Sequence, residues 1–316
     1  MTGYEALRTS AAWIDASARG KLRVRGEDRA RLLHAMSTND VQNLLPGSGV
    51  YAFFLNDKGR ILGDAYIYNL GESLFLDTEP ETAAKLRDHL DRYIIADDAE
   101  LSDETGQWAA IDLAGPGAMA CAEQLGLSTP ATRYGVQLST NGFVARIAST
   151  GSEGVRLFLP LDKEAELLAQ LEAAKIPIAS AEATRIVRIE NGVPRYGEDI
   201  SERYLVQETN ALHAVHFNKG CYLGQEIVER VRSRGQVHRV LMPLRIEGTQ
   251  PPAPGTKLMV EGKAVGEITC AVYSPAGGEV AALAYVRTEA ADAKAELVVA
   301  DSAPPQIARI VASGRA

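Results

Sequence analysis

The stretch FNKGCYLGQE, Phe217 to Glu226, stands where the pattern of the chain changes. Before it, short helical and strand patterns alternate. A helical run follows over Gln225–Arg232, and beyond Arg239 no convincing helix is apparent. Strand candidates follow at the spacing of a small barrel: Val240–Ile246, Lys257–Val260, Ala264–Tyr273, Val280–Val286, Ala295–Ala300 and Ile307–Val311. The sequence therefore predicts an α+β part followed by a C-terminal antiparallel β-barrel.

Upstream of this stretch, turn residues separate apolar runs. The runs Tyr51–Leu55, Arg60–Asn69 and Ser73–Asp77 are joined by short Asn-, Asp- and Gly-rich turns, which predicts an antiparallel meander. Residues 181–190 have a helical pattern, and Gly192 follows where a C-terminal cap is expected. The sequence therefore predicts both strands and helices before the barrel.

Length and composition are those of an ordinary globular protein. The 316 residues suggest two or three domains, with 46% hydrophobic residues and a formal charge of −8. No apolar window is long enough to span a membrane, and the N-terminus does not have the pattern of a secretory signal. Three widely spaced cysteines suit a reducing compartment, so a cytoplasmic protein is expected. The acidic total disfavours nucleic-acid binding.

The negative charge is interrupted by one cationic segment. Between residues 219 and 239, five cationic side chains stand against two acidic ones, a net charge of +3 from Lys219, Arg230, Arg232, Arg234 and Arg239 against Glu226 and Glu229. A cationic patch on an acidic protein suggests an anionic ligand held at one place. The alternative is a solvated face of arginines.

The same segment begins with a cysteine between two glycines. Gly220 and Gly224 flank Cys221, and Lys219 precedes it. A thiol near a helix N-terminus and a cation lies in positive potential, which favours the thiolate. The alternative is a small buried hydrophobic side chain, as is common for an isolated cysteine. A single cysteine cannot hold an iron–sulfur cluster alone, so a role with clusters would need a partner or a small thiol.

Two carboxylates stand in unusual surroundings. Asp64 falls inside a strand pattern, where an acidic residue is disfavoured, and Glu190 ends the helix of residues 181–190. A carboxylate can accept two parallel N–H donors from a planar group, such as a guanidinium or a pterin. For Asp64 the simpler interpretation is an exposed residue at a sheet edge.

Other sites have weaker support. Gly115–Ala120 imitates a dinucleotide-binding loop, but the required acidic residue does not follow, so a tight strand–helix turn is the better interpretation. Serine-hydrolase and P-loop motifs are absent from the sequence. His213, His216 and Cys221 do not have the spacing of a common zinc site, and we expect no metal there.

Several motifs together resemble a known family. The Lys219–Glu226 run, with Arg188–Gly197 (RIENGVPRYG) before it, resembles the YgfZ group of folate-binding proteins, which is related to the glycine-cleavage T-protein, an aminomethyltransferase. Tyr51–Asn56 (YAFFLN) and Gly59–Asp64 (GRILGD) are similar to the N-terminal half of the T-protein. T-proteins typically carry Asp-Asp where this chain has Gly63-Asp64.

The resemblance implies a fold and a domain organisation. The family fold is a ring of three domains around a channel for tetrahydrofolate, with α+β content and a C-terminal antiparallel β-barrel. By this likeness, residues 1–46 and 142–239 form a discontinuous α+β folate-binding domain. Residues 47–141 form an α+β, ferredoxin-like domain, and residues 240–316 form the barrel.

The resemblance also implies roles for single residues. By position, Asp64 matches an aspartate near the reactive nitrogens of folate, and Tyr51 matches a tyrosine of the folate pocket. Glu190 matches the carboxylate that binds the pterin, so that Asp64 and Glu190 are expected to meet at one pocket.

The cationic segment supplies the remaining candidates. Cys221 matches the cysteine of the YgfZ group and is, with Asp64, a candidate catalytic residue. Lys219 and Arg230 are expected to bind the cofactor, tetrahydrofolate or a derivative. The cationic segment is expected to attract either the glutamate tail of the folate or an acidic partner.

The resemblance leaves alternative functions open. The main hypothesis is a tetrahydrofolate-binding protein that assists the assembly or repair of iron–sulfur clusters, with client or assembly proteins as partners. The alternative is a folate-dependent aminomethyltransferase or demethylase, which is an enzyme of one-carbon transfer. A third is a non-catalytic scaffold that keeps a folate-binding shape. Neither nucleic acid nor a membrane is expected as a partner.

Overall fold

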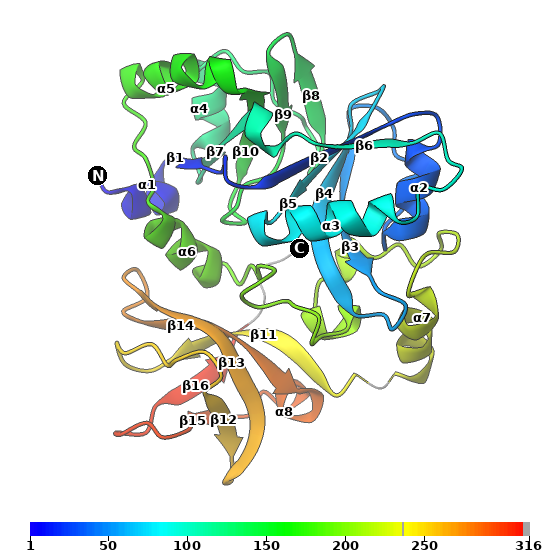
Figure 1. Ribbon diagram of the computed structural model, residues 1–316. Coiled ribbons are helices and arrows are strands. Elements are labelled where there is room, and N and C mark those ends of the chain that lie inside the picture. Colours follow the sequence, from blue (N-terminus) through cyan, green and yellow to red (C-terminus); the bar gives the residue numbers. More distant parts are fainter. Residues whose placement is uncertain (236, 312–316) are drawn as a thin grey trace. The chain divides into compact units, whose positions relative to one another are not determined.

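The chain forms two compact units. The computed structural model describes residues 1–235 and 237–311. The first unit contains Met1–Thr184 and His213–Gln225, and the second contains Arg185–Leu212 and Glu226–Ala316. The segment from 213 to 225 therefore returns to the first unit between two parts of the second. Figure 1 follows this path from blue to red.

One antiparallel sheet of the first unit carries the predicted meander. Its strand order is β3-β4-β5-β2-β6, with bounds β2 Gly20–Arg25, β3 Gly49–Leu55, β4 Ile61–Asn69, β5 Leu74–Thr78 and β6 Glu100–Asp103. Helices α2 (Arg29–Met36) and α3 (Ala83–Asp91) cover one face and bury Leu33 and Leu86 against Ala52, Phe54 and Ile67. The meander β3-β4-β5 is confirmed.

A second antiparallel sheet of the same unit has the order β1-β7-β10-β9-β8. Its strands are β1 Ala12–Asp15, β7 Trp108–Ala114, β8 Val136–Ser139, β9 Gly142–Ala145 and β10 Gly154–Pro160. Helices α4 (Ala118–Gln124) and α5 (Glu164–Ala173) pack on one face of it. All its pairings are antiparallel, so the turn at Gly115 is not part of a parallel dinucleotide-binding unit.

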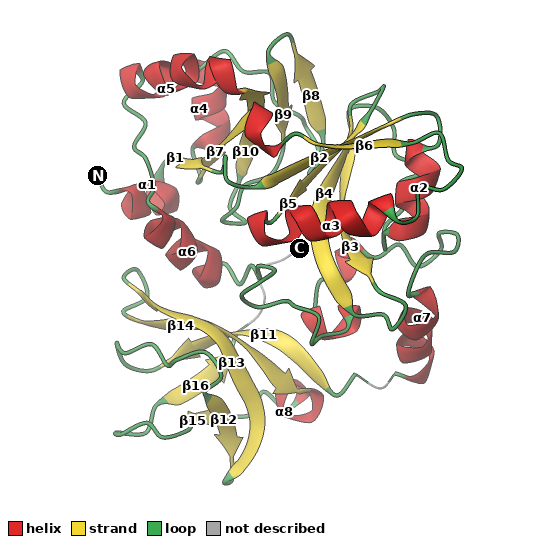
Figure 2. Cartoon of the chain, viewed as in Figure 1, coloured by secondary structure: helices red, strands yellow, loops and turns green. Residues whose placement is uncertain are grey.

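Aromatic side chains join the two sheets. Tyr68 and Phe75 of the first sheet contact Phe143 and Phe158 of the second, with ring centroids 5.1–5.9 Å apart. All four rings are buried. The first unit is thus layered helix–sheet–sheet–helix, as the secondary-structure colours of Figure 2 show, and polar groups on the inner faces must find partners there.

The remaining helices before the barrel lie in the first unit or in the segments of the chain that pass between the two units. They are α1 Gly3–Thr9, η1 Pro80–Thr82, η2 Thr105–Gln107, η3 Leu161–Lys163, α6 Ala181–Glu190, η4 Val206–Thr209, η5 Leu212–Ala214 and α7 Gln225–Arg234. Helix α6 has the predicted bounds and is followed by Gly192, which has φ +67°. The amides of Gly192 and Val193 bond back to Ile189 and Arg188, so this glycine is the C-terminal cap that was predicted.

The second unit contains a closed barrel of order β11-β14-β13-β12-β15-β16. Its strands are β11 Arg239–Ile246, β12 Lys257–Val260, β13 Lys263–Ser274, β14 Glu279–Arg287, β15 Leu297–Val299 and β16 Ile307–Ile310. The predicted barrel is confirmed, because each expected strand overlaps one of these. One expectation is wrong: a short helix, α8 (Thr288–Asp292), lies beyond Arg239. Its five residues are too few to show a helical period.

Candidate functional site

The centre of the candidate site is a short hydrogen bond between Tyr51 on β3 and Asp64 on β4. The register pairs Tyr51 with Tyr66 and Phe53 with Asp64, so these side chains share one face of the sheet. The Tyr51 hydroxyl donates to Oδ2 of Asp64 over 2.5 Å. Asp64 is only 6% exposed, because β4 lies between β3 and β5. The interpretation of Asp64 as an exposed edge residue is therefore wrong.

Aromatic rings lie close to Tyr51. The Tyr66 ring is 5.1 Å away and comes from the neighbouring strand. The His213 ring is 5.6 Å away, is inclined by 24°, and comes from the segment that returns to this unit. The sequence presents His213 only as a possible zinc ligand, whereas the structure places it beside Tyr51. Ring faces next to a buried carboxylate are typical of sites for planar, polar ligands.

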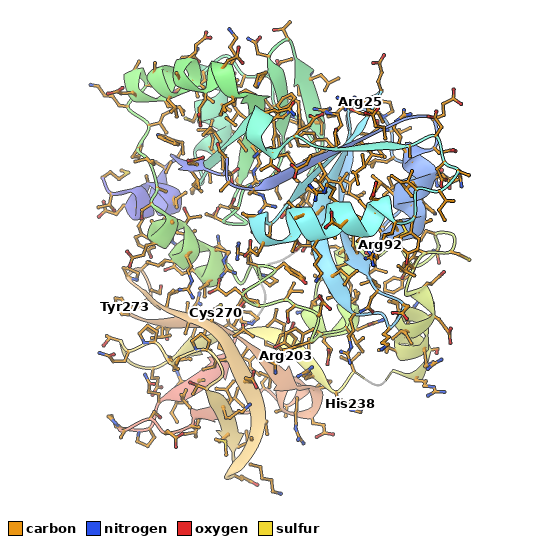
Figure 3. All side chains as sticks on the ribbon, in the orientation of Figure 1. Arg25, Arg92, Arg203, His238, Cys270 and Tyr273 are labelled. Atoms are coloured by element: carbon orange, nitrogen blue, oxygen red, sulfur yellow. The ribbon has the colours of Figure 1, made fainter. Side chains whose placement is uncertain are left out.

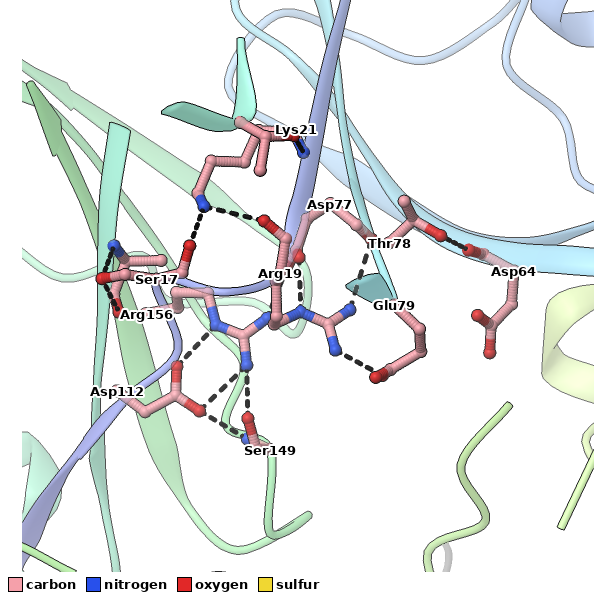
Figure 4. A network of polar contacts seen from close by, with 12 residues as sticks. Ser17, Arg19, Lys21, Asp64, Asp77, Thr78, Glu79, Asp112, Ser149 and Arg156 are labelled. Carbon is pink, nitrogen blue, oxygen red and sulfur yellow. Dashed lines mark hydrogen bonds and ion pairs between the residues drawn. The ribbon is translucent and has the colours of Figure 1, made fainter. Parts of the chain in front are cut away.

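A hydrogen bond from the neighbouring strand restrains the main chain of Asp64. The Thr78 hydroxyl, at the end of β5, donates to the Asp64 carbonyl oxygen over 2.5 Å and lies 2.7 Å from the Thr82 hydroxyl. Figure 4 shows this bond and shows the Asp64 carboxylate pointing away from it. The carboxylate therefore extends from a rigid strand toward the ring of Tyr51.

A second carboxylate at position 63 would crowd the side chain of Leu86. A Cβ atom added to Gly63 would lie 3.1–3.2 Å from the side chain of Leu86 on α3. Leu86 is fully buried in the core beneath the sheet. An aspartate at 63, as in the Asp-Asp pair of T-proteins, would require this packing to change.

A buried ion cluster lies beside the site, between the two sheets (Figure 4). Arg156 on β10 bonds Asp112 over 2.5 and 2.9 Å and also bonds Asp77 on β5. Arg19 bonds the same Asp77 over 2.5 Å and also bonds Glu79. Burial would raise the pKa of Asp77, but the guanidinium groups of Arg156 and Arg19 outweigh it and hold that pKa below its usual value.

The cluster was missed by sequence reasoning. Arg156 and Asp77 each lie inside an apolar run of the sequence. A charged residue in the interior of a strand is the signal that could have indicated the cluster. That signal predicts a buried partner of opposite charge but does not identify it.

The segment from 213 to 225 is bonded to the connection between α2 and β3. The His216 amide donates to the Thr38 carbonyl over 3.0 Å, and the Thr38 hydroxyl donates to the Ala214 carbonyl over 2.6 Å. The Leu223 amide donates to the Ala35 carbonyl over 2.9 Å. Both ends of the segment are therefore fixed within the first unit.

Lys219 lies at the middle of this segment and is buried. Its ammonium donates to the carbonyl oxygens of His34, Ser37 and Asn39, the last two over 2.7 and 2.8 Å. Burial lowers the pKa of Lys219 to about 7, against the opposing effect of Asp40. These contacts account for the N–H donors of an ammonium, so they do not support the predicted role of Lys219 in cofactor binding, which stays a prediction.

Cys221 follows on the same segment and is exposed. Gly224 has φ +82°, and a Cβ atom there would lie 2.8 Å from the Asn56 carbonyl oxygen. Only glycine fits this close approach without a shift of the main chain. The other cysteines, Cys121 and Cys270, are buried, and Figure 3 labels Cys270 among the side chains of the barrel. The alternative of Cys221 as a buried hydrophobic residue is wrong.

Glu190 and Arg230 belong to the second unit. Glu190 is 8% exposed, and its Oε1 accepts a bond from the Ser274 hydroxyl over 2.5 Å. Its carbonyl oxygen accepts from Arg245 Nη2 over 3.1 Å. Arg230 is exposed on α7 and bonds Glu226 over 2.6 Å. The predicted contacts of Glu190 with a pterin and of Arg230 with a folate tail stay predictions.

Metal-binding clusters and membrane-spanning helices are both absent from the part of the chain that the structure describes. In residues 1–235 and 237–311, no group of three or more His, Cys, Asp or Glu side chains is arranged to hold a metal ion. Over the same ranges, no helix has the length and apolar character needed to cross a bilayer.

Known families and structures match along nearly the whole chain. A model described as the GCVT N-terminal domain matches residues 2–219, and a model of the glycine cleavage T-protein C-terminal barrel domain matches residues 239–313. The aminomethyltransferase of Rubrobacter xylanophilus is 31% identical over 293 residues, which cover 90% of this chain and 78% of that protein. The aminomethyltransferase of Thermus thermophilus is 32% identical over 314 residues, with coverages of 95% and 86%.

Two further similarities are relevant. A putative chloroplastic transferase of Arabidopsis thaliana is 28% identical over 297 residues, covering 88% of this chain and 66% of that protein. The crystal structure of the glycine cleavage system aminomethyltransferase T from Bartonella henselae has a TM-score of 0.90, with 19% identity and coverage of 98% of this chain and 87% of that one. The predicted T-protein fold is thereby confirmed. On the two family models together, this chain belongs to the family of glycine cleavage T-proteins.

Proposed function

We propose that this protein binds tetrahydrofolate and acts in one-carbon transfer, as an enzyme of the aminomethyltransferase type. The observation that carries the proposal is the buried Asp64 carboxylate, oriented by the Tyr51 hydroxyl beside the rings of Tyr66 and His213. Relatives named aminomethyltransferase, which match most of the chain, support it.

The side chains present suit this cofactor. Tetrahydrofolate has a planar pyrimidinone with adjacent N–H donors, and it supplies an amine nitrogen that carries the one-carbon unit. Tyr51 and His213 offer ring faces for such a ligand. In the second unit, and considered by itself, Glu190 accepts a bond from Ser274 and is a candidate acceptor for paired N–H groups.

Asp64 would act at the reacting nitrogen. A carboxylate can accept a hydrogen bond or a proton from an amine, which keeps the nitrogen lone pair available for bond formation. The Tyr51 hydroxyl bonds one carboxylate oxygen, Oδ2, and so restrains the orientation of the carboxylate that would make this contact. A residue held in this way loses less orientational freedom during the reaction.

The test separates binding from chemistry. Calorimetry with tetrahydrofolate measures affinity. Incubation with a donor that carries an aminomethyl group on sulfur tests for transfer, in which the methylene carbon passes to tetrahydrofolate and ammonia is released. We expect Asp64→Asn to abolish product while affinity changes by less than about tenfold. Asp57→Asn is the matched control, because Asp57 is an exposed acid in the turn of the same hairpin. Affinity weaker than about 1 mM, near −4 kcal/mol, would contradict the proposal.

A second candidate function is supported by Cys221. An exposed thiol on a fixed segment is available for transient ligation or redox exchange with a partner, as the resemblance to the YgfZ group implies. We infer that, in this case, the protein assists iron–sulfur proteins. The test is the activity of cluster-containing enzymes in cells that carry Cys221→Ala, with Cys121→Ala as the control. Equal activity of the cluster-containing enzymes in cells with Cys221→Ala and in cells with Cys121→Ala would show that the Cys221 thiol has no part in this function.

A further inference from the structure

Asn39 stands between Lys219 and the candidate site. Its carbonyl oxygen accepts from the Lys219 ammonium over 2.8 Å. Its side-chain amide donates to the carbonyl oxygens of Tyr51, over 2.8 Å, and His213, over 3.1 Å. Asn39 is 9% exposed, so these bonds form in a largely desolvated place where each is strengthened.

These bonds form a continuous path to the carboxylate. It runs from Lys219 to Asn39, from Asn39 to Tyr51, and from the Tyr51 hydroxyl to Asp64. The same amide of Asn39 holds the main chain of His213, whose ring lies beside Tyr51. Lys219 is therefore linked through Asn39 to both Tyr51 and His213.

Carbonyl groups hold the Lys219 ammonium, although burial lowers its pKa to about 7. His34, Ser37 and Asn39, whose carbonyl oxygens it bonds, lie at the end of α2 and just beyond it, where unpaired carbonyls and the helix dipole favour positive charge. The centre of the Tyr222 ring lies 4.9 Å from the ammonium. A buried lysine with these partners restrains the main chain on two segments that are far apart in sequence.

We propose that Lys219 is a positioning residue for Asp64, acting through Asn39 and Tyr51. The inference rests on the proposed function, because it concerns the same carboxylate. It assigns to the lysine of the FNKGCYLGQE stretch a role in the orientation of the site instead of direct contact with a ligand.

The test uses paired variants of the full chain. Lys219→Met removes the cation, Lys219→Arg keeps the charge, and Asn39→Ala interrupts the path while leaving Lys219 in place. Lys58→Met is the control, because Lys58 is exposed in the turn between β3 and β4. Asn39→Ala keeps the test valid if Lys219→Met does not fold.

Two readouts are needed. The first is the carbon-13 carboxyl resonance of Asp64 without ligand, identified by its loss in Asp64→Asn. We expect it to shift in Lys219→Met and Asn39→Ala, to return toward the wild-type position in Lys219→Arg, and to stay in place in Lys58→Met. The second is turnover to methylene-tetrahydrofolate, where kcat falls by about tenfold or more in the first two variants and KM changes less.

The outcomes separate the two proposals. If the wild-type chain neither binds folate nor forms product, the proposed function fails, and the resonance alone decides the inference. An Asp64 resonance that stays at the wild-type position in both Lys219→Met and Asn39→Ala overturns the inference. A fall in thermal stability with unchanged kcat and an unchanged resonance would show that Lys219 is only structural, and it would also overturn the inference.

Discussion

The Tyr51 hydroxyl lies 2.5 Å from the Asp64 carboxylate, and the two residues sit on neighbouring strands but not directly opposite each other. Tyr51 faces Tyr66 across the strand pair, and the long tyrosine side chain reaches diagonally to Asp64. This diagonal contact restrains the orientation of the Asp64 carboxylate. The hydrogen bond between Tyr51 and Asp64 is therefore the contact that defines the geometry of the candidate site.

Tyr51→Phe should separate the hydrogen bond from the ring. The ring contacts remain, but a buried carboxylate loses a donor, which costs about 1–3 kcal/mol in the free energy of unfolding. Turnover should fall because Asp64 is no longer held in one orientation, while folate affinity changes little. Urea unfolding and steady-state kinetics measure these effects. Turnover equal to that of the wild type would show that the bond has no role in orientation.

Arg156→Met should strongly destabilise the first unit. The substitution leaves Asp112 without its guanidinium partner and Asp77 with only Arg19, in a place with almost no solvent. Loss of one partner from a buried ion pair costs about 3–5 kcal/mol. Urea unfolding measures the loss. Addition of Asp112→Asn should recover part of it, because the unpaired charge is then removed, and a double variant no more stable than Arg156→Met would contradict this account.

Lys219 should give the free energy of unfolding a defined pH dependence. Burial lowers its pKa from 10.5 to about 7 in the folded chain. Between these values the unfolded chain binds more protons, so stability rises with pH, by at most about 1.4 kcal/mol per pH unit. Asp40 and His34 face the same ammonium. The pKa of Asp40 is lowered from 3.8 and that of His34 is lowered from 6.5, so both groups titrate below the range in which Lys219 acts.

Comparison with Lys219→Met isolates this contribution. The difference in free energy of unfolding between wild type and variant should change in favour of the wild type as the pH is raised from about 7 to about 9. Urea titrations at several pH values measure it, with Lys58→Met as the control. A difference independent of pH would show that Lys219 does not titrate in this range.

The cysteines should differ sharply in reactivity. Cys221 is exposed, whereas burial raises the pKa of both Cys121 and Cys270. Iodoacetamide should therefore label one of the three cysteines in the folded chain and all three after unfolding. Mass spectrometry of the peptides identifies the site. Labelling of Cys121 or Cys270 at the rate of Cys221 would contradict the burial that the structure shows.

Much of the fold was predictable because its signals are local. Alternating apolar residues and turn residues predicted the meander and the barrel strands, and the helical pattern of residues 181–190 predicted α6 with its glycine cap. Helix α8 was not predicted, because one and a half turns do not establish a period. The three-domain boundaries implied by the resemblance stay a prediction, while the chain divides into two compact units.

The amino-acid sequence by itself determined the α+β and barrel content, the family, and Tyr51 and Asp64 as candidates, because periodicity and motifs can be read within a few tens of residues. Only the tertiary structure decided that Tyr51 bonds Asp64, that His213 lies beside them, and that Lys219 is buried against Asn39. These contacts join residues up to 180 positions apart. Their partners depend on which strands and segments meet after folding, and no local pattern contains that information.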